Sequence, residues 1–129
     1  MRLLLDTHVL LWAWREPERL SPTVRELIED ASVELLVSAA SAWEIATKSR
    51  LGKLPGAETV VFAYPESLNR LDVHEVPIDS HHALVAGGLD WDNQDPFDRI
   101  IGAQGILEGF PLVTNDRAFA TLTGVHRIW

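Results

Sequence analysis

The sequence predicts an α/β fold built on a mainly parallel sheet, and two observations lead to this prediction. Residues 2–5 form an apolar run too continuous for a strand with one solvent-facing side, which indicates a strand buried on both faces. Segments of strand character then alternate with segments of helical character, as is typical of βαβ units. No repeat, low-complexity run or linker divides the chain, so we expect a single domain over residues 1–129.

The first half of the chain carries clear helix signals. Thr7 is suited to cap a helix over residues 8–15. Ser21 and Pro22 are a preferred cap and a preferred first residue for a second helix, which reaches about Asp30. We then expect a strand at 34–37, a helix from Ala39 to Leu51 ended by Gly52, and helical structure over 57–71 that Pro65 breaks.

The second half continues the alternation. Asp95 and Pro96 form a strong helix start, and Gly109 is a typical terminator of the same helix near Glu108. The remaining expected elements are a strand at 73–76, a helix from Asp79 to Gly87-Gly88, a polar loop at 90–95, a strand at 112–114, a short helix at 117–122 and a strand at 125–129.

Composition narrows the class of protein. The 129 residues are 47% hydrophobic and 23% charged, which is ordinary for a globular chain. Cysteine is absent, which excludes disulfides and thiolate metal sites and favours a reducing compartment. We find neither an apolar segment of membrane-spanning length nor a secretory signal, and therefore expect a cytoplasmic protein without membrane contact.

The formal net charge of −8 argues against nucleic-acid binding driven by the overall charge of the protein. It does not exclude an enzyme that acts on nucleic acid, because carboxylates gathered around cations account for part of this excess. A local basic rim can still meet phosphates. The candidates for that rim are Lys48, Arg50, Lys53 and Arg99, which lie near acidic residues in the sequence, and Lys48, Arg50 and Arg99 are the three that we expect to contact RNA phosphates.

Four acidic residues, Asp6, Glu44, Asp98 and Asp116, lie at strand ends or within helical segments. Ligands of α/β folds bind outside the carboxyl ends of the strands. Carboxylates that share one crevice repel each other unless a cation neutralises them, and oxygen ligands suit hard cations such as Mg²⁺. The pattern therefore predicts a metal-dependent hydrolase. The expected supporting residues are Asp95, Thr7 and Thr114.

Asp6 and Asp116 also have a plain structural explanation, since an acid that follows a strand can cap the next helix. Thr7 could cap the first helix in place of Asp6. If all the acids were caps, the protein could be a non-catalytic interaction module. A second alternative is a phosphatase with Asp6 as nucleophile, although that chemistry normally needs another Asp where His8 stands.

Glu44 and Asp98 are ambiguous in the same way. The residues from Ser41 to Glu44 match a capping box, whereas a helix start at Ser38 places Glu44 one turn inside the helix. Asp95 and Asp98 both lie at a helix start, where either acid favours the positive end of the helix dipole. We expect Asp95 to cap and Asp98 to point inward.

The blocks around these acids resemble a PIN domain. They are Leu-Leu-Asp-Thr-His, Ser-Ala-Ala-Ser-Ala-Trp-Glu-Ile-Ala-Thr-Lys, Asp-Pro-Phe-Asp-Arg-Ile-Ile-Gly-Ala-Gln, Leu-Val-Thr-Asn-Asp and the closing Val-His-Arg-Ile-Trp. Their order and spacing match across essentially the whole chain, and they most resemble small bacterial PIN proteins of the VapC toxin type. Gly102 and Gly105 depart from the family pattern, in which residues better suited to a helix are usual.

This resemblance implies a three-layer α/β/α sandwich and a ribonuclease that depends on Mg²⁺ or Mn²⁺. It assigns Asp6, Glu44, Asp98 and Asp116, in this order, to the four acids of the family, with Asp6 and Asp98 as the main metal ligands. It also implies an RNA substrate, a homodimer and a cognate antitoxin whose tail would occupy the acidic groove.

Overall fold

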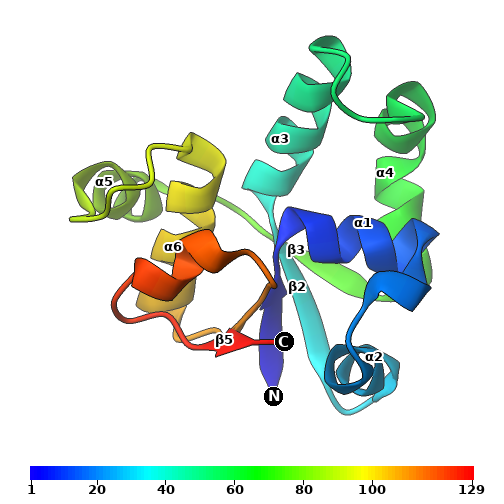
Figure 1. Ribbon diagram of the computed structural model, residues 1–129, viewed down its shortest axis with the longest axis horizontal. Coiled ribbons are helices and arrows are strands. Elements are labelled where there is room, and N and C mark those ends of the chain that lie inside the picture. Colours follow the sequence, from blue (N-terminus) through cyan, green and yellow to red (C-terminus); the bar gives the residue numbers. More distant parts are fainter.

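The computed structural model describes residues 1–129 and contains a central sheet of five strands, all parallel (Figure 1). The predicted parallel α/β fold is therefore confirmed. The strand order is β3-β2-β1-β4-β5. The strands are β1 (Arg2–Leu5), β2 (Glu34–Ser38), β3 (Val73–Val76), β4 (Leu112–Val113) and β5 (Arg127–Ile128).

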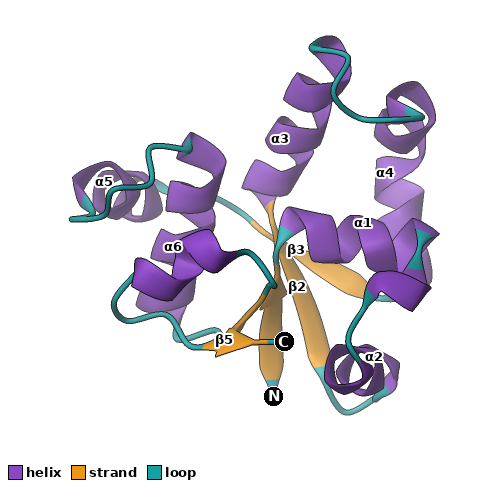
Figure 2. Cartoon of the chain, in the orientation of Figure 1, coloured by secondary structure: helices purple, strands orange, loops and turns teal.

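Helices cover both faces of this sheet, which gives the three layers visible in Figure 2. The α-helices are α1 (Thr7–Arg15), α2 (Pro22–Glu29), α3 (Ala39–Arg50), α4 (Ala57–Leu71), α5 (Ser80–Gly88) and α6 (Pro96–Glu108), and two 3₁₀ turns are η1 (Pro17–Arg19) and η2 (Arg117–Thr121). No helix combines the length and apolar character needed to cross a lipid bilayer.

Strand β1 explains why both layers have a core. Leu3 and Leu5 pack into one apolar cluster with residues of α1, α2 and α4, while Leu4 packs into a second cluster with residues of α6 and η2. All three leucines are at most 1% exposed. Successive side chains of a strand point to opposite faces, so a central strand needs apolar residues at every position.

Two local predictions are wrong. Asp6, rather than Thr7, caps α1, because its carboxylate accepts the Thr7 amide N–H at 2.7 Å. Helix α4 also continues through Pro65 without a break. Its buried residues Val60 and Leu68 lie on either side of Pro65 and pack into the same cluster. Pro65 itself is exposed, so water can bond to the carbonyl that loses its helical partner.

Gly102 has a packing role in α6. A Cβ at this position would lie 2.5 Å from Leu122 Cδ2, and near Phe119 and Trp91. A larger residue at this position would therefore force the buried Leu122 side chain to move. This departure from the family pattern allows close packing in the α6 layer.

The strand order creates one topological switch point, between β1 and β4. The chain passes from β1 to β2 and β3 on one side, then returns to β4 and β5 on the other. The Asp6 amide N–H donates to the Val113 carbonyl at 3.0 Å, which ties the ends of the two strands together. A switch point of this kind is the usual place for a ligand crevice in an α/β fold, and the acids lie around it.

A pair of glycine substitutions tests the packing of α6. We expect Gly102→Ala to lower the free energy of unfolding by about 1–3 kcal/mol, because the added methyl group must displace buried Leu122. The matched change Gly87→Ala in α5 meets nothing within 4 Å and should raise stability, by at most about 1 kcal/mol. Urea unfolding measures both, and a stabilising Gly102→Ala would contradict the packing argument.

Candidate active site at the carboxyl edge of the sheet

Asp6 lies at the end of the central strand and is 3% exposed. Its Oδ1 accepts the Thr7 amide N–H at 2.7 Å, and its Oδ2 accepts the Thr114 hydroxyl at 2.8 Å. Burial raises the pKa of Asp6 to about 6; the charges of Glu44 and Asp116 add to this rise, while the two hydrogen bonds oppose it. Asp6 is therefore a helix cap and also a desolvated carboxylate.

Glu44 projects from α3, which begins after Ser38, because the Ser38 hydroxyl accepts the Ala40 amide N–H at 3.0 Å. The capping-box alternative for Glu44 is thus wrong, and Glu44 lies inside the helix at 3% exposure. Its Oε2 pairs with the Lys48 ammonium at 2.8 Å, but its buried Oε1 has no hydrogen-bond partner. A buried carboxylate oxygen without a donor is unfavourable unless a cation can reach it.

Asp98 stands in the first turn of α6, as expected. Asp95 caps this helix, because its Oδ1 accepts the amide N–H groups of Phe97 and Asp98 at 2.9 and 3.1 Å. The half-buried Asp98 carboxylate accepts the Asn93 amide at 2.9 Å through Oδ2. Burial raises the pKa of Asp98 to about 7 against the lowering effect of Asn93, and the charges of Asp95, Asp6 and Glu44 raise it further.

Asp116 follows β4 and caps η2, since its Oδ1 accepts the Ala118 amide N–H at 2.9 Å. Its own amide N–H donates to the Thr114 hydroxyl at 3.0 Å, and the same hydroxyl donates to Asp6. Thr114 therefore joins the strand ends at the switch point. Asp116 is half-buried and its charge acts on Asp6.

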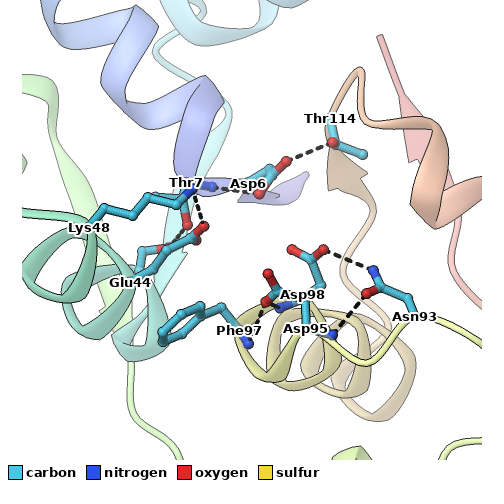
Figure 3. Close-up of polar contacts among 10 residues, drawn as sticks. Asp6, Thr7, Glu44, Lys48, Asn93, Asp95, Phe97, Asp98 and Thr114 are labelled. Carbon is cyan, nitrogen blue, oxygen red and sulfur yellow. Dashed lines mark hydrogen bonds and ion pairs between the residues drawn. The ribbon is translucent and has the colours of Figure 1, made fainter. Parts of the chain in front are cut away.

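The carboxylates of Asp6, Glu44 and Asp98 face the same space, bounded by α1, α3 and α6 (Figure 3). Their mutual effects on pKa show that they are electrostatic neighbours. They do not form a ready-made metal cage: no group of three or more His, Cys, Asp or Glu side chains is arranged to hold an ion as these side chains stand. Each of the three instead accepts a bond from Thr114, Lys48 or Asn93.

The donor set nevertheless suits a hard divalent cation. It consists of carboxylate oxygens, which Mg²⁺ prefers. Oε1 of Glu44 is buried without a partner, and burial, with a further contribution from the charges of neighbouring acids, raises the pKa values of Asp6 and Asp98. A divalent cation bound among these carboxylates would offset their negative charge.

The three basic residues suggested for phosphate contact occupy different settings. Lys48 already pairs with Glu44 at the crevice, and Arg50 is exposed at the end of α3. Arg99 donates its guanidinium N–H groups to four backbone carbonyls, which gives it a structural role. For Lys48 and Arg50, contact with RNA stays a prediction.

Sequence reasoning missed Asn93 and Ser41. Asn93 donates a hydrogen bond to Asp98. The Ser41 hydroxyl lies 2.7 Å from the Thr7 hydroxyl, and this contact links α3 to α1. Asn93 had a weak signal, because an Asn two residues before a helix cap often bonds to the backbone ahead of it. The partner of Ser41 is 34 residues away, so no local pattern could identify it.

Comparisons with known proteins identify relatives of this chain. A family model described as the PIN domain matches residues 3–125. "Ribonuclease VapC22" of Mycobacterium tuberculosis (strain ATCC 25618 / H37Rv) is 35% identical over 120 residues, which are 89% of this chain and 87% of that protein. "Ribonuclease VapC16" of the same organism is 40% identical over 58 residues, covering 45% of this chain and 41% of that protein.

Solved structures share the fold at low sequence identity. VapBC2 from Rickettsia felis, bound to a DNA fragment from its promoter, aligns with a TM-score of 0.72 and 17% identity, covering 99% of this chain and 98% of that chain. FitAcB from Neisseria gonorrhoeae aligns with a TM-score of 0.59 and 21% identity, covering 100% of this chain and 97% of that chain.

The raised pKa of Asp6 predicts a pH-dependent stability in the metal-free protein. The folded protein holds the Asp6 proton more tightly than the unfolded chain, so this group costs stability as pH rises from about 4 to 7, by up to about 3 kcal/mol. Asn can bond to the same neighbours without charge. We therefore expect Asp6→Asn to be more stable than the wild type in EDTA at pH 8, with little difference at pH 4.

Urea unfolding at the two pH values in EDTA measures this effect. Because the two proteins differ only at this residue, the difference between them reports the Asp6 charge together with its repulsion of neighbouring acids such as Asp98. An Asp6→Asn variant that is less stable than the wild type at pH 8 would contradict the desolvation argument.

The ion pair of Glu44 gives a second prediction. Lys48→Met leaves the buried Glu44 carboxylate without its cation, so we expect a loss of about 1–3 kcal/mol in EDTA. Added Mg²⁺ should narrow the gap to the wild type by stabilising the folded protein. The exposed Lys53, which makes no ion pair, supplies the matched control Lys53→Met. Equal stability of wild type and Lys48→Met in EDTA would refute the pairing.

Proposed function

Because this chain belongs to the PIN-domain family, we propose that it is a divalent-metal-dependent endoribonuclease and the toxin of a toxin–antitoxin pair. Two relatives, one aligned with 89% of this chain and the other with 45%, are named ribonucleases. The observation that carries the proposal is the cluster of acids at the switch point, in which a Glu44 oxygen is buried without a partner. A stable fold alone does not require this arrangement.

Asp6, Glu44 and Asp98 would hold Mg²⁺ or Mn²⁺ in this crevice, with Asp116 beside them. Such an ion, when bound, supplies Lewis-acid polarisation of a phosphate and makes a coordinated water easier to deprotonate. The residues of the chain fix where this happens. Thr7 and Thr114 orient Asp6, Asp95 and Asn93 orient Asp98, and α3 presents Glu44.

The proposed reaction is hydrolysis of an RNA phosphodiester. The oxygen of a water molecule bonds to phosphorus while the P–O3′ bond breaks, which leaves a 5′-phosphate and a 3′-hydroxyl. In this proposal Glu44 or Asp116 orients the attacking water or holds a second ion, and neither needs to become a covalent nucleophile. Lys48 lies at the crevice and Arg50 near it in the sequence, so both remain our candidates for contact with the RNA phosphates.

The proposal includes protein partners. The VapBC and FitAB structures share this fold, and this supports the proposal that the chain has a cognate antitoxin. Large apolar side chains are exposed on three helices, with Phe62 90%, Leu84 76% and Trp43 54% exposed. Side chains of this kind on the surface favour contact with other protein chains. We therefore propose a homodimer as well as an antitoxin, in the cytoplasm.

The interaction-module alternative has one observation in its favour, since Asp6, Asp95 and Asp116 do cap helices. Capping does not explain Glu44, which is buried inside α3. Capping also does not explain why the Asp98 carboxylate faces inward, because Asp95 already caps α6. For the phosphatase alternative, both oxygens of Asp6 already accept hydrogen bonds in a buried position, which is unfavourable for in-line attack on phosphorus.

Cleavage assays on single-stranded RNA test the proposal. We expect Asp6→Asn and Asp98→Asn each to slow Mg²⁺- or Mn²⁺-supported cleavage by about 100-fold or more, because loss of a metal ligand removes several kcal/mol of transition-state stabilisation. The matched control is Asp72→Asn, an exposed acid in a left-handed conformation that Asn also tolerates. Cleavage that persists in EDTA would overturn the metal-dependent mechanism.

A further inference from the structure

The guanidinium group of Arg99 organises the segment between α5 and α6. Its Nε donates to the Ala86 carbonyl at 2.9 Å, and one terminal nitrogen donates to Leu89 at 2.6 Å. The other terminal nitrogen donates to the carbonyls of Trp91 and Asn93, at 3.0 and 2.8 Å. Four of the five N–H donors of Arg99 thus form hydrogen bonds with backbone carbonyls that precede α6 in the sequence.

This use of Arg99 has a clear physical reason. Residues 89–95 lie in no helix or strand, so their carbonyls lack the regular partners that buried backbone groups require. A planar guanidinium carries five donors in a fixed fork and can reach several carbonyls at once. A lysine ammonium at the same place has three donors at a single point and cannot span these four acceptors.

Asn93 is the residue through which this segment reaches the acids. Its backbone carbonyl accepts from Arg99, its side-chain Oδ1 accepts the Asp95 amide N–H at 2.9 Å, and its Nδ2 donates to Asp98 Oδ2 at 2.9 Å. Since an N–H must point at Oδ1, the amide orientation is fixed and Nδ2 has to face Asp98. Figure 3 shows both bonds, with the other Asp98 oxygen on the side of Asp6 and Glu44.

We propose that Asn93 and Arg99 are positioning residues for the Asp98 carboxylate, with Arg99 acting through Asn93. Asn93 holds one oxygen of Asp98, which leaves the other directed at the crevice. Arg99 keeps Asn93 in place by bonding to its carbonyl and to the carbonyls before it. The inference rests on the proposed function, because it gives Asp98 the part of a metal ligand, and it replaces the expectation that Arg99 contacts RNA.

The test compares Asn93→Ala, Arg99→Lys and the double variant with the wild type. Three quantities are measured: Mn²⁺ affinity by calorimetry without RNA, kcat and KM for RNA cleavage, and hydrogen exchange of the Asp95 amide in EDTA. Asp79→Ala is the control, because it removes the N-cap of α5 in the same layer without touching Asp98. It should lower the melting temperature and leave Mn²⁺ affinity unchanged.

We expect each single variant to weaken Mn²⁺ binding by about 10- to 100-fold, the usual effect of losing a residue that orients a metal ligand. The loss in cleavage should fall on kcat more than on KM. Exchange of the Asp95 amide should be faster in both, since its acceptor is removed or released. The double variant should bind Mn²⁺ no more weakly than the single variant with the lower affinity, because Arg99 acts on Asp98 only through Asn93.

The inference is overturned if Asn93→Ala keeps wild-type Mn²⁺ affinity, or if Arg99→Lys loses stability like Asp79→Ala without any change in affinity. Additive losses in the double variant would also overturn it, since they would make Arg99 independent of Asn93. A wild type that binds Mn²⁺ but cleaves no RNA would remove the proposed function and leave the positioning role to be decided by affinity and exchange. A wild type that binds no Mn²⁺ overturns both.

Discussion

The burial of the Asp6 carboxylate at the end of the central strand is the constraint on which the rest of the site depends. An acid that is 3% exposed and surrounded by other acids destabilises the fold when it is charged. The fold compensates with two donors, one from the first residue of α1 and one from Thr114 beyond β4. The bond from Thr114, together with the bond from the Asp6 amide N–H to the Val113 carbonyl, also joins the ends of β1 and β4 at the switch point.

The other acids show the same partial compensation. Lys48 neutralises one oxygen of Glu44, and Asn93 serves one oxygen of Asp98. In each case a single donor holds the carboxylate without satisfying it fully, as the unpartnered Glu44 oxygen demonstrates. A crevice built in this way is stable enough to fold and still favours the arrival of positive charge. This balance is the physical basis for proposing a divalent cation in it.

Helix capping and the proposed chemistry use the same residues rather than competing for them. Asp6 caps α1 through Oδ1 while its Oδ2 joins Thr114, and Asp95 caps α6 in a way that sets the first-turn position of Asp98. The opposition between a cap and a functional acid, which a sequence alone invites, therefore disappears at Asp6. A cap with a second carboxylate oxygen can orient a site and begin a helix at the same time.

The sequence by itself determined the features that depend on neighbours along the chain. The buried strand at 2–5 follows from its continuous apolar run, and the starts of α2, α5 and α6 follow from the caps Ser21, Asp79 and Asp95. The positions of the acids relative to these elements could be predicted in the same way. Each of these inferences needs only a few adjacent residues, because propensity and capping act within one or two turns.

Only the tertiary structure decided the features that depend on distant partners. Thr114 reaches Asp6 across 108 residues of sequence, and Leu122 packs where a side chain at position 102 would otherwise lie. Buried residues of α4 before and after Pro65 pack into one cluster, which keeps the helix continuous. Arg99 looks like a surface cation in the sequence, but packing directs it to four carbonyls. These contacts depend on which groups are buried together, and this is determined only when the helices have packed on the sheet.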